Sequence, residues 1–149
     1  KAASGLLPSQ ARILASIDPE INEQTSPLPL HACIELNPGK RVSLRRGITT
    51  IGRDDTNDIF LDQPEIQSQR LVSGQHAYIR GDDVEYRIFD GSPSGRSSVN
   101  GTFVNNRRVP PEGQPLQDGD TIILAALDPG NPRPDIPGVA VLRFLRSCL

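Results

Sequence analysis

The chain has 149 residues, of which 36% are hydrophobic and 23% charged, and its formal net charge is -2 at pH 7. This length predicts one domain with its own hydrophobic core, and no apolar run approaches the roughly 20 residues of a membrane-spanning helix, so a soluble domain without membrane contact is expected. The small negative charge argues against the broad basic field on which nucleic-acid binding relies, so any bound anion must be held locally.

The chain begins with a segment, residues 1–28, that we interpret as a linker or disordered arm. Residues 10–17 could form about two helical turns, but prolines bound this stretch on both sides. The absence of Met from the sequence favours a fragment of a larger protein. We expect the domain itself to span residues 29–146, with a short C-terminal tail at 147–149.

The body of the chain shows short runs of alternating apolar and polar residues, the pattern of half-buried strands. Glycine, asparagine, aspartate and proline separate these runs and suit tight hairpin turns. The pattern predicts an all-β sandwich or barrel. The expected strands are 31–36, 41–46, 49–52, 59–61, 76–80, 84–90, 102–104, 107–109, 121–127 and 139–145.

Two segments, 62–72 and 91–101, interrupt the hairpin rhythm and are long enough to be functional loops. Binding residues concentrate on loops that a rigid sheet positions. The second segment is rich in serine, proline and glycine, so a plain flexible connector is the alternative there.

Cys33 and Cys148 lie far apart in the sequence and lack the paired spacing of a zinc site, so no metal site is expected. We interpret them as two small apolar residues in or near strands. A disulfide in an oxidising compartment is the alternative, because the first and last strands of a sandwich can be neighbours.

Five short motifs follow one another through the body of the chain. They are IGR at 51–53, NDIFL at 57–61, VSGQHAYI at 72–79, SVNGTFVN at 98–105 and LQDGDTI at 116–122. This succession resembles the forkhead-associated (FHA) domain family in every signature block and in their order. A single block would occur by chance in many proteins, whereas five in order are specific.

The resemblance covers about residues 30–127, and extends to about 146 if 139–145 is the closing strand. It implies an FHA-like β-sandwich of about eleven mostly antiparallel strands whose loops at one end bind a phosphothreonine peptide. It also implies a cytoplasmic, monomeric domain of a larger protein, with no catalytic residue, no metal and no cofactor. The expected partner is a phosphothreonine-containing protein or peptide, not nucleic acid or membrane.

The residues matched to the family's ligand-binding positions have suitable chemistry. Arg53 presents a planar fork of donors that can meet two phosphate oxygens together, and the hydroxyl of Ser73 adds one directed donor. Asn100 is matched to the family's peptide-binding asparagine, whose amide can both donate to and accept from a peptide backbone. Arginine-centred recognition of phosphorylated motifs is an established binding mode, for which this family is a stock example.

The remaining motif residues are expected to be structural. His76 resembles a residue that braces the loops without contacting ligand. Gly52, Gly101, Thr102 and Asn105 are interpreted as framework, with Gly101 supplying the backbone freedom that an Asn-Gly turn needs.

Two positions depart from the family pattern. The residue after Ser73 is usually Arg, Lys or Asn but here is Gly74, which has no side chain to donate, and the residue before Asn100 is commonly Thr or Ser but here is Val99. Both are still expected to line the peptide site. We hypothesise that Arg70, in a longer than usual preceding loop, swings in to replace the lost charge.

Two other functions compete with phosphothreonine binding. Ser73 and His76 with an acid such as Asp90 could form a hydrolase triad, but no Gly-x-Ser-x-Gly elbow surrounds Ser73 and the strand–helix rhythm of that fold is missing. The second alternative keeps the FHA fold as a protein-docking domain that binds without phosphate.

Overall fold

The computed structural model describes residues 32–36, 39–82 and 84–148. The expected arm at 1–28 lies outside the described residues. Within those ranges no helix has the length and apolar character needed to cross a membrane. The described elements are β1 (Cys33–Leu36), β2 (Lys40–Ser43), β3 (Gly47–Gly52), β4 (Ile59–Phe60), α1 (Pro64–Gln69), β5 (Ala77–Gly81), β6 (Tyr86–Asp90), β7 (Thr102–Val104), β8 (Arg107–Arg108), β9 (Gln114–Pro115), β10 (Thr121–Leu124) and β11 (Ala140–Leu145).

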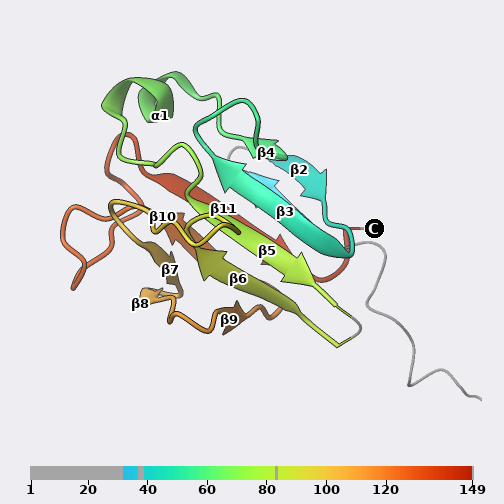
Figure 1. Cartoon of the computed structure of the whole chain (residues 1–149). Coiled ribbons are helices and arrows are strands. Elements are labelled where there is room, and N and C mark those ends of the chain that lie inside the picture. Colours follow the sequence, from blue (N-terminus) through green and yellow to red (C-terminus); the bar gives the residue numbers. More distant parts are fainter. Residues whose placement is uncertain (1–31, 37–38, 83, 149) are drawn as a thin grey trace, which may run out of the picture.

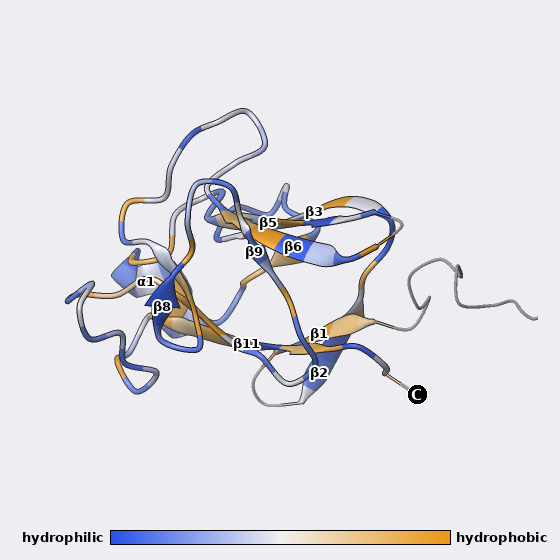
Figure 2. Cartoon of the chain, turned by 90° about the horizontal axis from the view of Figure 1, so that it is seen from below, coloured by the Kyte–Doolittle hydropathy of each residue, from blue (hydrophilic) through white to orange (hydrophobic). Residues whose placement is uncertain are grey.

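The strands form two sheets that pack face to face (Figures 1 and 2). One sheet has the order β2-β1-β11-β10-β7-β8 and the other the order β4-β3-β5-β6-β9. The pairing of β3 with β4 is parallel, and the other described pairs are antiparallel. The expected all-β sandwich of about eleven mostly antiparallel strands is therefore confirmed.

The core lies between the sheets and follows from the two-residue period of the strands. In β5, Ile79 is buried while Tyr78 and Arg80 point to the outer face, and in β11 Leu142 and Phe144 are buried. Burial of these large side chains is the main favourable term for the fold, at about 1.5–3 kcal/mol each.

A short helix, α1, stands where the sequence analysis expected only loop between residues 62 and 72. Pro64 is in its first turn, where the missing N–H costs nothing, and Ile66 packs into the core. The helix ends at Arg70, whose backbone is left-handed with φ 57° and whose N–H donates to the Ile66 carbonyl. Six residues are too few to show a helical period in the sequence.

The end of β3, the start of β5, the end of β6 and helix α1 all lie at one end of the sandwich, and the C terminus lies at the other (Figure 1). The strands therefore bring the β3–β4, α1–β5 and β6–β7 loops together, although they are far apart in sequence.

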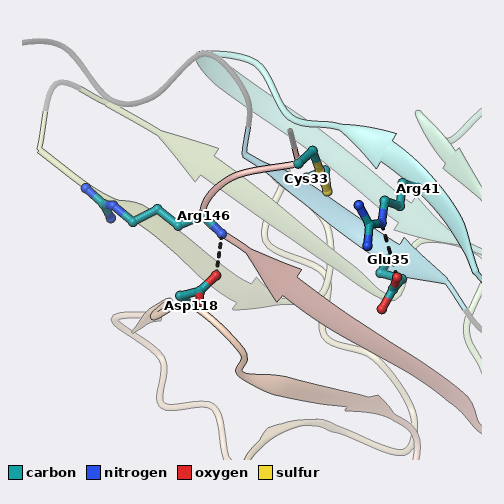
Figure 3. Close-up of a disulfide and its surroundings, with 6 residues drawn as sticks. Cys33, Glu35, Arg41, Asp118 and Arg146 are labelled. Carbon is teal, nitrogen blue, oxygen red and sulfur yellow. Dashed lines mark hydrogen bonds and ion pairs between the residues drawn. A yellow bond between two sulfur atoms is a disulfide. The ribbon is translucent and has the colours of Figure 1, made fainter.

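At the opposite end, Cys33 of β1 and Cys148 after β11 are joined by a disulfide with a Cα–Cα distance of 6.0 Å (Figure 3). The interpretation of the cysteines as two unpaired apolar residues is therefore wrong. The strands β1 and β11 are neighbours, with Cys33 opposite Leu145. This pairing places the residues that follow β11 beside the start of β1. The tail is also held by a bond from the Arg146 N–H to an Asp118 carboxyl oxygen, at 2.9 Å.

Candidate functional site

The β3–β4 loop and the α1–β5 loop are joined by their backbones. The N–H groups of Arg53 and Asp54 donate to the carbonyls of Ser73 and Gly74, both at 3.1 Å. The His76 N–H returns to the Ile51 carbonyl at 2.9 Å. These bonds continue the ladder of β3 and β5 past the strand ends, so the two loops form one surface.

The side chain of Arg53 is half-buried and fixed at one nitrogen. Its Nε donates to the Val72 carbonyl at 2.9 Å. Its two terminal nitrogens have no hydrogen-bond or ion-pair partner within the described part of the chain. A guanidinium held in this way presents its outer donors to a ligand, and little further side-chain freedom is lost when the ligand binds.

Ser73 connects this surface to the β6–β7 loop. Its Oγ accepts a hydrogen bond from the Val99 N–H at 3.0 Å. Because the oxygen is used as an acceptor, the hydroxyl proton remains free to donate. Val99 itself is 83% exposed, so an apolar side chain stands beside the hydroxyl.

His76 is completely buried between the same two loops. Its Nδ1 accepts from the Ser73 N–H at 2.9 Å, and its Nε2 lies 2.7 Å from the Gly101 carbonyl. Since Nδ1 is an acceptor, the proton belongs on Nε2 and the ring is neutral. Burial lowers the pKa of His76, an effect larger than the opposing hydrogen bond to Gly101 and the charge of Asp90.

The Asn100 side chain crosses from the β6–β7 loop to the segment after α1. Its Nδ2 donates to the Leu71 carbonyl at 2.9 Å. The second N–H and the carbonyl oxygen of this amide have no partner within the described residues, so they are available to a peptide backbone.

Asp90 anchors the base of the β6–β7 loop, a role that the sequence analysis missed. One carboxyl oxygen accepts from the hydroxyls of Ser98 and Thr102, at 2.5 and 2.7 Å, and the other accepts from the Ser98 N–H at 3.1 Å. The Ser98 hydroxyl in turn accepts from the Gly101 N–H at 2.9 Å. This network fixes the backbone that carries Asn100.

The hydrolase geometry is absent from these residues. His76 bonds to the backbone N–H of Ser73 and not to its hydroxyl, and the Asp90 carboxylate bonds to Ser98 and Thr102. A triad requires the imidazole to contact both the nucleophile and the acid.

Asn57 is a second bracing residue that the sequence analysis did not single out. Its amide nitrogen donates to the carbonyls of Asp54 and Gly74, at 2.8 and 2.6 Å. Gly52 lies against the same turn, where an added Cβ would collide with the Gly74 carbonyl oxygen. The close approach of the two loops therefore needs glycine at 52.

Gly74 lies under a carboxylate. A Cβ added at this position would stand 2.5 Å from a carboxyl oxygen of Asp54. The space that a longer side chain would use after Ser73 is therefore occupied by a negative charge from the β3–β4 loop, next to Arg53.

Two other predicted residues lie apart from this cluster. The Arg70 side chain is exposed and makes no hydrogen bond or ion pair with the described residues, although Arg70 directly precedes Leu71. Asn105 is in the β7–β8 turn, where its amide bonds Asp120 at 2.8 Å and the Thr121 N–H at 3.0 Å. Among the described residues, no group of three or more His, Cys, Asp or Glu could hold a metal ion.

Comparison with known proteins identifies the type of domain. The family model described as FHA domain matches residues 49–125. The oxoglutarate dehydrogenase inhibitor of Corynebacterium efficiens is 40% identical over 86 residues, which are 58% of this chain and 51% of that protein. The chain thus spans about half the length of the curated relatives it matches.

Solved structures give the same result. A structure from a study of phosphothreonine-dependent FHA domain interactions has a TM-score of 0.53 and 28% identity, over 75% of this chain and 94% of the other. Mycobacterium tuberculosis EmbR in complex with a low affinity phosphopeptide has a TM-score of 0.54 and 29% identity, over 78% of this chain and 24% of EmbR.

Proposed function

Because this chain belongs to the FHA domain family, we propose that it binds phosphothreonine on partner proteins and so mediates phosphorylation-dependent protein–protein interaction. The main support for the proposal is that three side chains on adjoining loops are held in place and still have free hydrogen-bond donors. Arg53, Ser73 and Asn100 are each held by one internal hydrogen bond and each keep a further donor free.

Each of the three residues contacts a different part of the ligand. The outer nitrogens of Arg53 bind two phosphate oxygens and the Ser73 hydroxyl binds a third. The Asn100 amide binds the peptide backbone, and Val99 gives the peptide an apolar contact. Gly74 lines the peptide site with its backbone, since the Asp54 carboxylate occupies the space of a side chain there.

Arg70 is the second cation of the proposed site. It lies at the end of α1, beside the Leu71 carbonyl that receives Asn100, and its guanidinium is free of described partners. Rotation of this long side chain toward the phosphate would replace the donor missing at Gly74.

The test is binding of a fluorescent phosphothreonine peptide drawn from an oriented library, measured by anisotropy. We expect Arg53→Ala to weaken binding by about 100-fold, since hydrogen bonds to charged groups contribute about 1.5–3 kcal/mol each. Arg41→Ala, which removes an exposed arginine on β2, is the matched control and should leave affinity unchanged. Equal affinity of the phosphorylated and unphosphorylated peptides would overturn the proposal.

Two further measurements address the charge of the ligand. Arg70→Ala should weaken binding by about fivefold, as expected for a solvent-exposed charge pair; unchanged affinity would remove Arg70 from the site. Affinity should also fall between pH 7.5 and 5, because the second pKa of the phosphate is about 6 and the dianion becomes a monoanion.

The second candidate function is docking of a partner without phosphate. Gly74 and the Asp54 carboxylate above it favour this alternative, because they put a negative charge where a cation would assist. Comparing capture of one partner before and after phosphatase treatment separates the two functions, since only phosphate recognition is lost.

The proposal includes a binding role without catalysis and a cytoplasmic location, as part of a larger protein. In that location the Cys33–Cys148 pair would be reduced, because disulfides are rare in a reducing cytosol. Trapping free thiols in intact cells with a maleimide tests it, since a cytoplasmic protein should be labelled at both cysteines.

A further inference from the structure

A cleft of about 540 Å³ is lined in part by the β6–β7 loop. Tyr78 and Phe89 line it from the outer face of β5 and β6, and Ser92 and Ser97 from the loop. Arg108 of β8 and the prolines that follow it close the remaining side. None of these residues has a part in the proposed phosphate site.

An aromatic pair forms the apolar part of the cleft. Tyr78 and Phe89 are opposite each other in the β5–β6 register, and their rings stack with centroids 4.9 Å apart and planes 9° apart. Both are half-buried on a face where the neighbouring Ile79 and Ile88 point into the core. The parts of the two rings that stay exposed offer a ligand an apolar contact of limited area.

The lining of the cleft contains one arginine, Arg108, and one carboxylate, Asp90. The Arg80 guanidinium lies 4.7 Å from the Phe89 ring centroid, and neither Arg80 nor Arg108 is in an ion pair with the described residues. The carboxylate in the lining, Asp90, already accepts three hydrogen bonds from Ser98 and Thr102. These bonds direct the Asp90 oxygens toward Ser98 and Thr102 but leave its charge in place. With two arginines against one carboxylate, the groups at the cleft carry a net positive charge, which suits an acidic ligand that also carries an apolar group.

We propose that this cleft is a second docking site, which takes a short extended acidic segment of a partner protein and buries one large apolar side chain of that segment against Tyr78 and Phe89. Arg108 binds a carboxylate of the segment. Docking here does not require phosphate at Arg53. Two arginines and rings stacked on each other do not provide the basic track and free ring faces that single-stranded nucleic acid needs, so a peptide is the favoured occupant.

The cleft lies close to the proposed phosphate site, because residues of the same loop contribute to both. Ser97 lines the cleft, and two residues later the Val99 N–H bonds the Ser73 hydroxyl. Two residues span at most about 7 Å. One partner can thus occupy both sites, and a flexible link of a few residues would raise the effective concentration of the second segment.

The test is an NMR titration of the ¹⁵N-labelled full chain with the unphosphorylated peptide acetyl-Glu-Asp-Phe-Asp-Glu-amide. We expect shift changes to concentrate at Tyr78, Phe89, Ser97 and Arg108. Arg108→Gln should weaken binding by about fivefold, as for a partly exposed charge pair. Arg107→Gln is the matched control, because Arg107 precedes Arg108 on β8, is also exposed and does not line this cleft. It should change the affinity by less than about twofold.

Several outcomes would overturn the docking site. The site would be excluded if millimolar peptide caused no shift changes, or if Arg107→Gln and Arg108→Gln weakened binding equally. It would also be excluded if a peptide with lysine in place of the acidic residues bound as well as the acidic peptide, or if a ten-nucleotide oligothymidine bound more tightly. The Arg53→Ala variant should bind the acidic peptide as the parent does. Failure of phosphothreonine binding therefore leaves this result unaffected, and the two proposals are separable.

Discussion

The two ends of the sandwich are held together by different forces. At the loop end, beyond the few backbone bonds that extend the β3–β5 ladder, single polar side chains such as the buried His76 and Asn57 and the half-buried Asp90 hold the loop backbones. At the other end, β1 is paired along its length with β2 and β11, and a disulfide fastens the chain. Buried backbone groups outside a ladder must be satisfied by side chains, so the geometry of the loop end depends on few residues.

This difference leads to a general expectation. Damage at the end that carries the disulfide should lower stability and leave ligand affinity unchanged, whereas damage at the loop end should lower both. The following experiments test that separation.

The largest effect on stability is expected from loss of the disulfide. Cys148→Ser should lower the free energy of unfolding by about 2–5 kcal/mol, because the bond closes a long loop, with a sequence separation of 115. Urea denaturation measures the loss, and reduction of the parent should reproduce it. Phosphopeptide affinity should stay the same at a temperature where the variant is folded; a parallel fall in affinity would contradict the separation of the two ends.

His76→Ala should affect stability and binding together. The change leaves the buried Ser73 N–H without a partner, at about 1–3 kcal/mol, and removes one of the two hydrogen bonds to the Gly101 carbonyl, which still accepts from the Ala125 N–H. We expect a loss of about 3 kcal/mol in urea denaturation and a phosphopeptide affinity reduced by more than tenfold. Ile88→Val, a core change costing about 1 kcal/mol, is the control that should destabilise without changing affinity.

Acidification should act on the same residue. Burial lowers the pKa of His76 in the folded protein, so below pH 6.5 the unfolded chain takes up a proton that the folded chain does not. Stability should be constant above that pH and fall as the pH decreases toward the folded pKa, by at most about 1.4 kcal/mol per pH unit from this group. Denaturation at several pH values measures the slope, and a His76→Gln variant that keeps the same slope would assign it to other groups.

The smallest expected effect is a gain of affinity. Asp54→Asn removes the carboxylate that lies over Gly74, beside the proposed phosphate site. Less repulsion of a dianion should strengthen phosphopeptide binding by about three- to fivefold. Asp55→Asn is the matched control, and an equal gain from both changes would indicate a general charge effect.

The strands and the motif residues could be predicted from the sequence because both are local patterns. Alternation marks β5 and β11, and the resemblance of the motifs to the FHA family singled out Arg53, Ser73 and Asn100, which lie on adjoining loops in the structure. Helix α1 was missed because six residues are too few to show a helical period. Strand β9 was missed because it has only two residues, and one of them is Pro115.

Contacts between distant segments could not be predicted. An aspartate at the end of a strand is an ordinary turn residue in sequence, and the role of Asp90 depends on Ser98 and Thr102 reaching it from the far side of a loop. The contact between Asp54 and Gly74 depends on the meeting of two loops whose residues are 20 apart in sequence. The disulfide, which the sequence offered only as an alternative, depends on β1 lying next to β11.

The disulfide also determines how the domain responds to mechanical tension. A pull applied to the segments that precede Cys33 and follow Cys148 passes through the covalent sulfur bridge, so the strands between these residues carry no load. While the bridge is intact, the domain acts as an inextensible link, and the loops that carry the proposed phosphate site stay assembled under force.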